Sequence, residues 1–251
     1  MLRIKRLKLD NGTQSYLHRK QAEANQMHGA GTLDTSKLWK SARQTKTLSK
    51  ALKVLQQMMG QRQRCMYCLD SHGSDIEHFR PKAVYPKRMF NWRNLLLCCS
   101  ECGRIKGDRF PLQGNKPLLI DPTKEQPWQY IDFDPMTGNL VARFDPITNE
   151  YSIKGESTVI TLQLDQREAL AAGYKQTFTR LSKVVQTFLN APHHNAQQLI
   201  AELRSQDDHG LLGWVFIGTG NNVEPFRQLQ QLHIAMWTAC NSALRKLEIS
   251  G

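Results

Sequence analysis

The sequence of 251 residues has little that would place it in a membrane or outside a cell. Its longest apolar stretch, residues 211–217, is far shorter than the roughly 20 residues that a membrane helix needs. The basic start MLRIKRLKLD has no apolar stretch behind it, so we expect no secretory signal. These features exclude a membrane protein, a secreted disulfide scaffold and a fibrous protein. They predict a globular cytoplasmic protein that has no contact with membranes.

Acidic residues are scarce in the first quarter of the chain. Residues 1–64 hold 14 Lys and Arg but only 3 Asp and Glu, whereas residues 115–251 hold 12 and 14. The net charge of +12 is therefore concentrated near the N-terminus. Basic charge in one segment is typical of proteins that bind a phosphate backbone. The alternatives are a solubilising surface or a basic arm that grips an acidic protein.

The sequence also lacks a glycine-rich phosphate loop of the Walker type, so we expect no ATP hydrolysis by the chain itself. Any nucleotide dependence would have to come from a partner. The C-terminal half carries no chemistry that a motif identifies, and its neutral to acidic charge suits a protein partner better than a polyanion.

Apolar spacing and turn residues predict the secondary structure. N-caps at Asp34–Ser36 and a leucine pattern ending at Gly60 predict an N-terminal helix. The turn-like segments DPMTG and DPITN, on either side of LVARF, predict a β-hairpin or small meander. Further helices are expected at 165–189, with Asp165 as its N-cap, at 195–205, and at 225–247.

The cysteines form the strongest motif. Four of the six make two C-x-x-C pairs, which are Cys65, Cys68, Cys99 and Cys102. In a chain without a secretory signal, such pairs indicate metal binding rather than disulfides, and two of them complete a tetrahedral structural zinc site. The 30 residues between the pairs predict a sizeable insert. We interpret Cys98 as a buried packing residue and Cys240 as core.

The insert carries residues suited to phosphodiester hydrolysis. Glu77 could hold a hard divalent cation, and neutral His78 could take a proton from water. Adjacent strand residues point to opposite faces, unless a strand end or bulge turns both into one cleft. Asn94 could orient the imidazole through its side-chain amide. Nearby cations that could position phosphates are Arg80, Lys82, Arg93, Lys106 and Arg109. Such an assembly is typical of a metal-assisted phosphodiester hydrolase.

The order CxxC, DxEHFxP, WxNL, CxxC and xxxK over residues 62–122 resembles the HNH endonuclease family. The forms IEHFRPK and NWRNLLLCCSECGRIKGDRFP are most similar to HNH proteins of bacterial anti-phage systems, the Septu PtuB type and its retron-associated relatives. The resemblance implies a ββα-metal core braced by zinc. It also implies a nuclease that works with an ABC-type ATPase and acts on nucleic acid, with DNA favoured over RNA and RNA left open as the alternative. A stand-alone restriction or repair enzyme of the same family is a further alternative.

The resemblance implies a role for individual residues. His78 matches the general base, Glu77 a ligand of catalytic magnesium or manganese, and Asn94 the residue that supports the hairpin and orients the base. Asp75 matches a second acidic position of the cleft, and the four paired cysteines match the zinc ligands. The residue after the last zinc cysteine is usually His or Asn and contacts the catalytic metal, but here it is Gly103. The alternative function is therefore a weak or inactive zinc module that binds nucleic acid or a partner ATPase.

Together these patterns predict an α+β, mostly helical protein with four regions. A basic helical region covers 1–61, and the HNH core with its zinc knuckles covers 62–122. A β-hairpin or connecting region covers 123–164. A C-terminal helical region at 165–251 is the expected partner surface.

Overall fold

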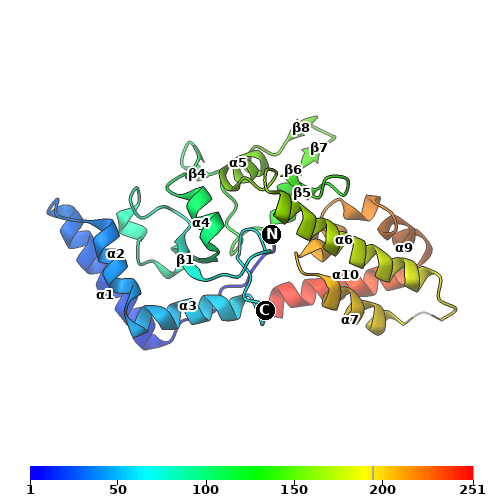
Figure 1. Ribbon diagram of the computed structural model, residues 1–251, viewed down its shortest axis with the longest axis horizontal. Helices are drawn as coiled ribbons and strands as arrows, with labels where there is room; N and C mark the ends of the chain where they lie inside the picture. The colour runs from blue at the N-terminus through cyan, green and yellow to red at the C-terminus, as the bar shows by residue number, and fades with distance from the viewer. Residues whose placement is uncertain (194, 251) are drawn as a thin grey trace.

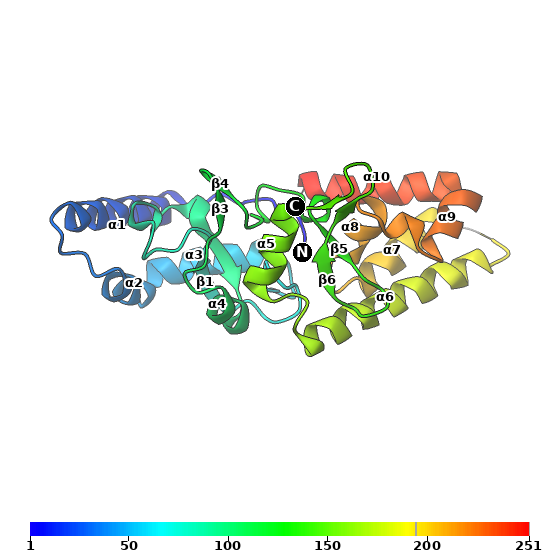
Figure 2. The same ribbon diagram turned by 90° about the horizontal axis from the view of Figure 1, so that it is seen from above.

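The structure is a computed structural model that describes residues 1–193 and 195–250. It has an α+β fold in which about half of the residues are helical, and the described strands form four small antiparallel sheets of two strands each. The N-terminal helices lie at one end of the molecule and the C-terminal helices at the other, with the sheets between them (Figures 1 and 2). The expected α+β class is confirmed. No helix in the described residues is long and apolar enough to cross a membrane.

The N-terminal region contains α1 (Asn11–Gly29), α2 (Thr35–Arg43) and α3 (Lys46–Met58). Asp34 caps α2 as predicted, but Thr45 interrupts the helix by capping α3 through a hydrogen bond from the Leu48 N–H. The sequence did not predict α1, which buries only three side chains and therefore has little apolar pattern. Its N-cap is Asp10, whose carboxylate accepts the Thr13 N–H at 2.9 Å.

The centre of the molecule is a strand–strand–helix unit. Strand β1 (Asp75–His78) pairs antiparallel with β2 (Leu95–Cys98), and α4 (Ser100–Lys106) follows directly. The loop between β1 and β2 contains η1 (Pro86–Arg88) and η2 (Trp92–Asn94). Every residue of β2 is buried, so this small sheet is held from both faces. A short hairpin of β3 (Leu112–Gln113) and β4 (Lys116–Pro117) comes after α4.

The connecting region contains the predicted β-meander as two hairpins. Their strands are β5 (Ile131–Phe133), β6 (Leu140–Ala142), β7 (Phe144–Asp145) and β8 (Glu150–Tyr151), preceded by η3 (Pro127–Gln129). The sequence did not predict the helix α5 (Ile153–Leu162) in this region, because the β-branched run TVIT favours a strand. Packing decides the outcome. Gly155 brings α5 so close to the Tyr130 carbonyl that a Cβ there would lie 1.9 Å from its oxygen.

The C-terminal region is helical throughout. Its elements are α6 (Glu168–Leu189), α7 (Ala196–Gln206), α8 (Leu211–Phe216), η4 (Gly220–Asn222), α9 (Phe226–Leu232) and α10 (Ile234–Ser250). The predicted α7 is confirmed, but the helix expected at 225–247 is two helices separated at His233. Asp165 as an N-cap is also wrong. The chain turns after the left-handed Gln163, so Arg167 becomes the N-cap residue of α6.

Candidate active site and metal centre

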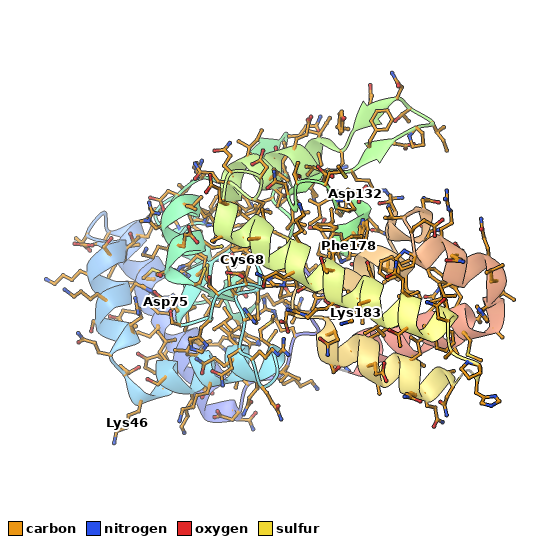
Figure 3. The ribbon with its side chains drawn as sticks, turned by 45° about the vertical axis from the view of Figure 1, so that its right-hand side comes forward. Lys46, Cys68, Asp75, Asp132, Phe178 and Lys183 are labelled. Atoms are coloured by element: carbon orange, nitrogen blue, oxygen red, sulfur yellow. The ribbon has the colours of Figure 1, made fainter. Side chains whose placement is uncertain are left out.

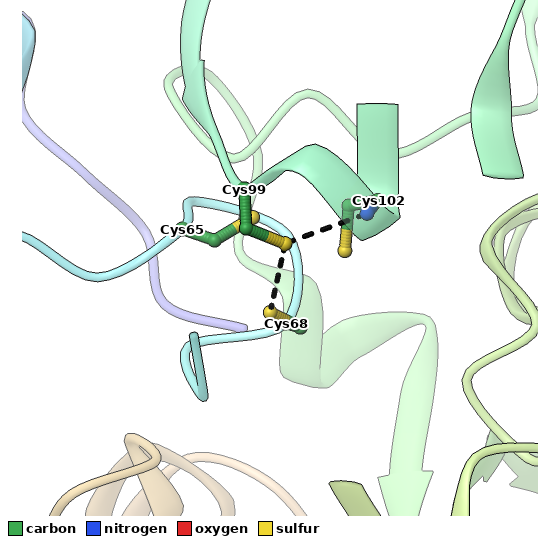
Figure 4. A group of neighbouring side chains, drawn as sticks. All are labelled: Cys65, Cys68, Cys99 and Cys102. Atoms are coloured by element: carbon green, nitrogen blue, oxygen red, sulfur yellow. Dashed lines mark hydrogen bonds between the residues drawn. The ribbon is translucent and has the colours of Figure 1, made fainter. Parts of the chain in front are cut away.

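The four paired cysteines meet at one point, as their spacing predicts (Figure 4). All four are buried, and their sulfur atoms lie within 4.8 Å of one another. A zinc–sulfur distance of about 2.3 Å places the sulfurs of a tetrahedral site about 3.8 Å apart. The Cys68 and Cys99 sulfurs are 3.9 Å apart, and Cys99 also caps α4 by accepting the Cys102 N–H. The cluster can therefore hold a metal ion such as zinc.

Cys98 lies beside this cluster without being part of it. Its sulfur is 3.9 Å from that of Cys65, and the residue is almost wholly buried at the end of β2. Cys240 is buried in α10, in agreement with its interpretation as core.

The C-terminal region is attached to the two cysteine knuckles by polar contacts. The Tyr174 hydroxyl donates to the Cys68 carbonyl at 3.0 Å, and Arg167 donates to the Cys102 sulfur at 3.3 Å while pairing with Glu101. Figure 3 shows Cys68 near the long α6 helix, whereas Asp75 lies toward the N-terminal helices. A cation beside the cluster offsets part of the negative charge of four thiolates.

Glu77 lies on the side of β1 that faces α4. Its Oε1 accepts a hydrogen bond from the Lys106 ammonium at 3.0 Å, and the same oxygen accepts the His78 N–H. Lys106 is wholly buried and also donates to the His78 carbonyl at 2.8 Å. Burial raises the pKa of Glu77, although the Lys106 charge acts in the opposite direction. The sequence analysis expected Lys106 to contact a phosphate. Its ammonium is instead buried inside the structure, where it contacts Glu77 and the His78 carbonyl.

Gly103 lies next to the free oxygen of the same carboxylate. A Cβ at this position would be 3.5 Å from Glu77 Oε2. A side chain at position 103 would therefore be placed to bind a cation held by Glu77. Because the residue is glycine, position 103 supplies no side-chain ligand for a metal ion.

His78 ends β1 and is buried on the side opposite to Glu77. Its Nε2 lies 2.9 Å from the Met89 carbonyl oxygen, which can only accept, so Nε2 carries the proton and Nδ1 the free lone pair. The Trp39 ring packs edge-on against the imidazole at 4.3 Å between centroids. Burial, together with the Lys82 and Lys106 charges, lowers the pKa of His78 to about 3. The imidazole is thus neutral at physiological pH.

Asn94 braces the loop between β1 and β2 rather than the imidazole. Its Oδ1 accepts the Arg80 N–H at 2.8 Å, and its Nδ2 donates to the carbonyls of Arg80 and Arg88, both at 3.0 Å. All three bonds go to backbone. The Met89 carbonyl, in the loop that Asn94 closes, makes the contact with His78 that the sequence suggested for the amide.

Helix α2 supplies residues of this site that the sequence analysis missed. A hollow of about 420 Å³ lies between α2 and the loop after β1, lined by Trp39, Lys40, Arg43 and Lys82 among others. Arg43 pairs with Asp75 at 3.1 Å, so this acid is held by a cation. The basic charge of residues 1–64 was the one signal for such residues, and no motif could show that α2 packs beside His78.

The other expected phosphate contacts lie apart from this hollow. The Arg80 guanidinium stacks on the rings of Tyr85 and Phe110, at 5.1 and 4.9 Å. Arg93 is exposed and lines a different hollow. Arg109 is exposed and hydrogen-bonds to the Ile105 carbonyl of α4. The structure thus brings Lys82 to the Glu77 and His78 neighbourhood and leaves these three arginines outside it.

The donor set for a hard catalytic cation is small. Glu77 Oε2 is open toward Gly103, and Asp75, two residues earlier on the same face of β1, is engaged by Arg43. Apart from the four cysteines, no group of three or more metal-ligating side chains occurs in the described residues. A magnesium or manganese ion fits here if water supplies most of its ligands, which is usual for magnesium.

Comparison with known proteins relates the chain to one group. The chain matches no protein-family model. Over 112 residues it is 33% identical to the Septu protein PtuB of Bacillus thuringiensis. The match covers 43% of this chain and 38% of that protein, so the chain spans well under half of its relative's length. The similarity relates part of this chain to a Septu protein.

Proposed function

We propose that this protein is a metal-dependent HNH endonuclease. Its substrate is nucleic acid, DNA in preference to RNA, and its context is an anti-phage defence system with an ABC-type ATPase as partner. The observation that carries the proposal is the β1–β2–α4 unit. It holds Glu77 and His78 at the end of one strand, with four clustered cysteines at the start of the helix. The similarity to the Septu protein PtuB supports the defence context.

His78 is the proposed general base. Its proton on Nε2 is fixed by the Met89 carbonyl, which leaves the Nδ1 lone pair to accept a proton from the attacking water. The low pKa keeps the imidazole unprotonated before substrate arrives. A phosphodiester bound nearby adds negative charge, which raises the pKa of the base and makes it a better proton acceptor.

The cations around the site bind the substrate. Lys40, Arg43 and Lys82 line the hollow that Trp39 shares, and Trp39 contacts His78. These three side chains can hold phosphates on either side of the bond to be cleaved. A divalent cation held by Glu77 and water would polarise the phosphate and stabilise the charge that develops on its oxygens.

A second candidate function is a zinc module that binds nucleic acid or the ATPase without cleaving. Two observations favour it. Gly103 offers no ligand where the family has one, and the Lys106 ammonium already neutralises Glu77. In this alternative, Lys106 takes the structural place of the catalytic cation.

The test is cleavage of plasmid DNA and of total RNA by the purified chain with magnesium or manganese, alone and with the proposed ABC-type ATPase partner. The nuclease proposal expects cleavage that requires the divalent cation, with DNA the better substrate. Binding without cleavage under all these conditions would contradict it and support the second candidate. Cleavage of RNA alone would overturn the choice of DNA.

A further inference from the structure

A second hollow lies outside the site of Glu77 and His78. It has a volume of about 800 Å³ and is enclosed by the extended N-terminal segment, by α1 and by residues 87–93. Its charged lining residues are Arg6, Lys8, Lys87 and Arg93, with His18 beside them, and none of its lining residues is acidic. A hollow with cations on two separate segments and no carboxylate attracts anions.

The floor of this hollow is rigid. The Arg6 guanidinium donates to the carbonyls of Trp92 and Leu95, both at 2.9 Å, and lies over the Trp92 ring at 5.1 Å. The Trp92 indole donates to the Leu7 carbonyl at 2.9 Å. Arg6 also donates to the Thr123 hydroxyl at 3.1 Å, so it ties the N-terminal segment to the core.

The cations at the rim are free to bind a ligand. Lys8, Lys87 and Arg93 are exposed, and none of them takes part in an ion pair within the described residues. Clustered like charges repel one another, so an arrangement that brings three of them together without a carboxylate fits an anionic ligand. Their separation over the N-terminal segment and residues 87–93 fits an extended polyanion better than a single ion.

The hollow shares a loop with His78. Gln21 of α1 accepts the Phe90 N–H at 2.8 Å and donates to the Pro86 carbonyl at 2.9 Å. The neighbouring residue, Met89, holds the His78 imidazole. Phe90 lines the hollow, and its ring packs on Trp39, 5.4 Å between centroids. A strand held in the hollow therefore lies against the back of the loop that positions the base.

We propose that this hollow binds the sugar–phosphate backbone of the nucleic acid at a distance from the cleaved bond. The inference rests on the proposed function and adds to it a second contact with the substrate. It also gives the acid-poor N-terminal segment a role. Lysines in such a site contact phosphates and do not read the base sequence. Each phosphate contact releases counterions, so binding there depends strongly on the salt concentration.

The experiment measures binding separately from cleavage. A labelled DNA oligonucleotide of about two helical turns is titrated with the full-length His78→Ala protein, without added divalent cation, over a range of salt concentrations. Each lost phosphate contact lowers the steepness of the salt dependence by about one. The double variant Lys8→Ala/Lys87→Ala in this background should therefore lower it by about two and weaken binding.

The matched control is Lys175→Ala/Lys183→Ala, two exposed lysines of α6 (Figure 3 labels Lys183). It removes the same charge and should leave binding unchanged. A further variant, Asn91→Asp, keeps an acceptor for the Arg93 N–H and puts a negative charge in the hollow, so it should weaken binding without loss of fold. An unchanged salt dependence in the Lys8/Lys87 variant, or an equal loss in the control, would overturn the inference.

These outcomes separate the inference from the proposed function. DNA binding that needs Lys8 and Lys87 in a protein that never cleaves supports the hollow and contradicts only the nuclease. With Lys8→Ala/Lys87→Ala placed in the wild-type background and divalent cation added, cleavage and binding that both survive support the nuclease and overturn the hollow.

Discussion

The core at 62–122 and the C-terminal region at 165–251 are each stabilised by different interactions. The core has two-stranded sheets, one helix of seven residues, and buried polar groups, among them Lys106 and His78. The C-terminal region packs long helices through apolar faces, as α6 does with its buried leucines and Tyr174. A chain segment too small to bury enough apolar surface needs ions and metal to fix its shape. In the proposed function, His78 of this core also serves the chemistry.

The largest expected effect comes from removing a zinc ligand. Cys68→Ser should abolish zinc binding, measured as metal content of the purified protein, and should remove the cooperative unfolding of the core. Structural zinc contributes on the order of 10 kcal/mol to folding. Cys240→Ala, a buried thiol in the C-terminal region, should keep full zinc content. Stoichiometric zinc in the Cys68 variant would show that the four cysteines are not the site.

The buried ion pair of the core gives the next largest effect. Lys106→Met leaves the Glu77 carboxylate without its partner and should lower the free energy of unfolding by about 3 kcal/mol, measured by urea denaturation. Lys20→Met removes a surface pair with Glu23 and should change it by less than about 1 kcal/mol. Adding Glu77→Gln to Lys106→Met should restore part of the loss. Equal effects of the two lysine variants would remove the distinction between core and surface.

A buried histidine at the boundary between the two regions should make the free energy of unfolding depend on pH. His209 of the C-terminal region lies 3.2 Å from Asp70 and 2.8 Å from the Thr177 hydroxyl. Burial lowers the pKa of His209 to about 4, although Asp70 raises it. The unfolded chain takes up a proton below about pH 6.5, whereas the folded chain does so only near pH 4.

Stability should therefore be constant above about pH 6.5 and fall as the pH drops toward 4, by up to about 1.4 kcal/mol per pH unit for this residue. His78 contributes in the same direction down to about pH 3. His209→Gln should flatten the pH dependence of urea unfolding between about pH 7 and about pH 5. The exposed His193→Gln serves as the control and should leave the dependence as it is. A His209 variant that retains the full dependence would contradict this assignment.

The smallest effect concerns how a helix begins in each part of the molecule. Helix α1 buries few side chains and depends on its Asp10 cap, whereas α6 has no side-chain cap bond and depends on packing. Asp10→Ala removes the cap bond to the Thr13 N–H, so it should lower the free energy of unfolding and speed hydrogen exchange in α1. Asp165 lies three residues before the start of α6 and does not cap it. Asp165→Ala should therefore change neither the free energy of unfolding nor the hydrogen exchange measurably. A loss at Asp165 equal to that at Asp10 would contradict the comparison.

The sequence predicted what local patterns encode. The C-x-x-C spacing predicted the cysteine cluster, the turn segments predicted the meander, and the apolar spacing predicted the face of α6. It did not predict α1, which lacks an apolar stripe, or α5, whose β-branched residues favour a strand until Gly155 allows close packing. Local pattern carries no information on such tertiary contacts.

The candidate site divides in the same way. The order of the motifs identified Glu77 and His78 as candidate site residues. The side chains that contact them lie far away in sequence. Lys106 reaches Glu77 across 29 residues, and Trp39 of α2 packs on the imidazole from outside the motif. Basic character alone suggested a surface role for Lys106, and only its burial reveals the ion pair.

The central claim is that the core, through His78, cleaves nucleic acid. The most direct measurement is the rate of metal-dependent cleavage by His78→Ala beside His72→Ala, an exposed histidine in a neighbouring loop, at equal zinc content. The account predicts cleavage lost in the His78 variant and retained in the His72 variant. Removal of a general base costs roughly 10²–10⁴ in rate. Wild-type cleavage by His78→Ala would contradict the account.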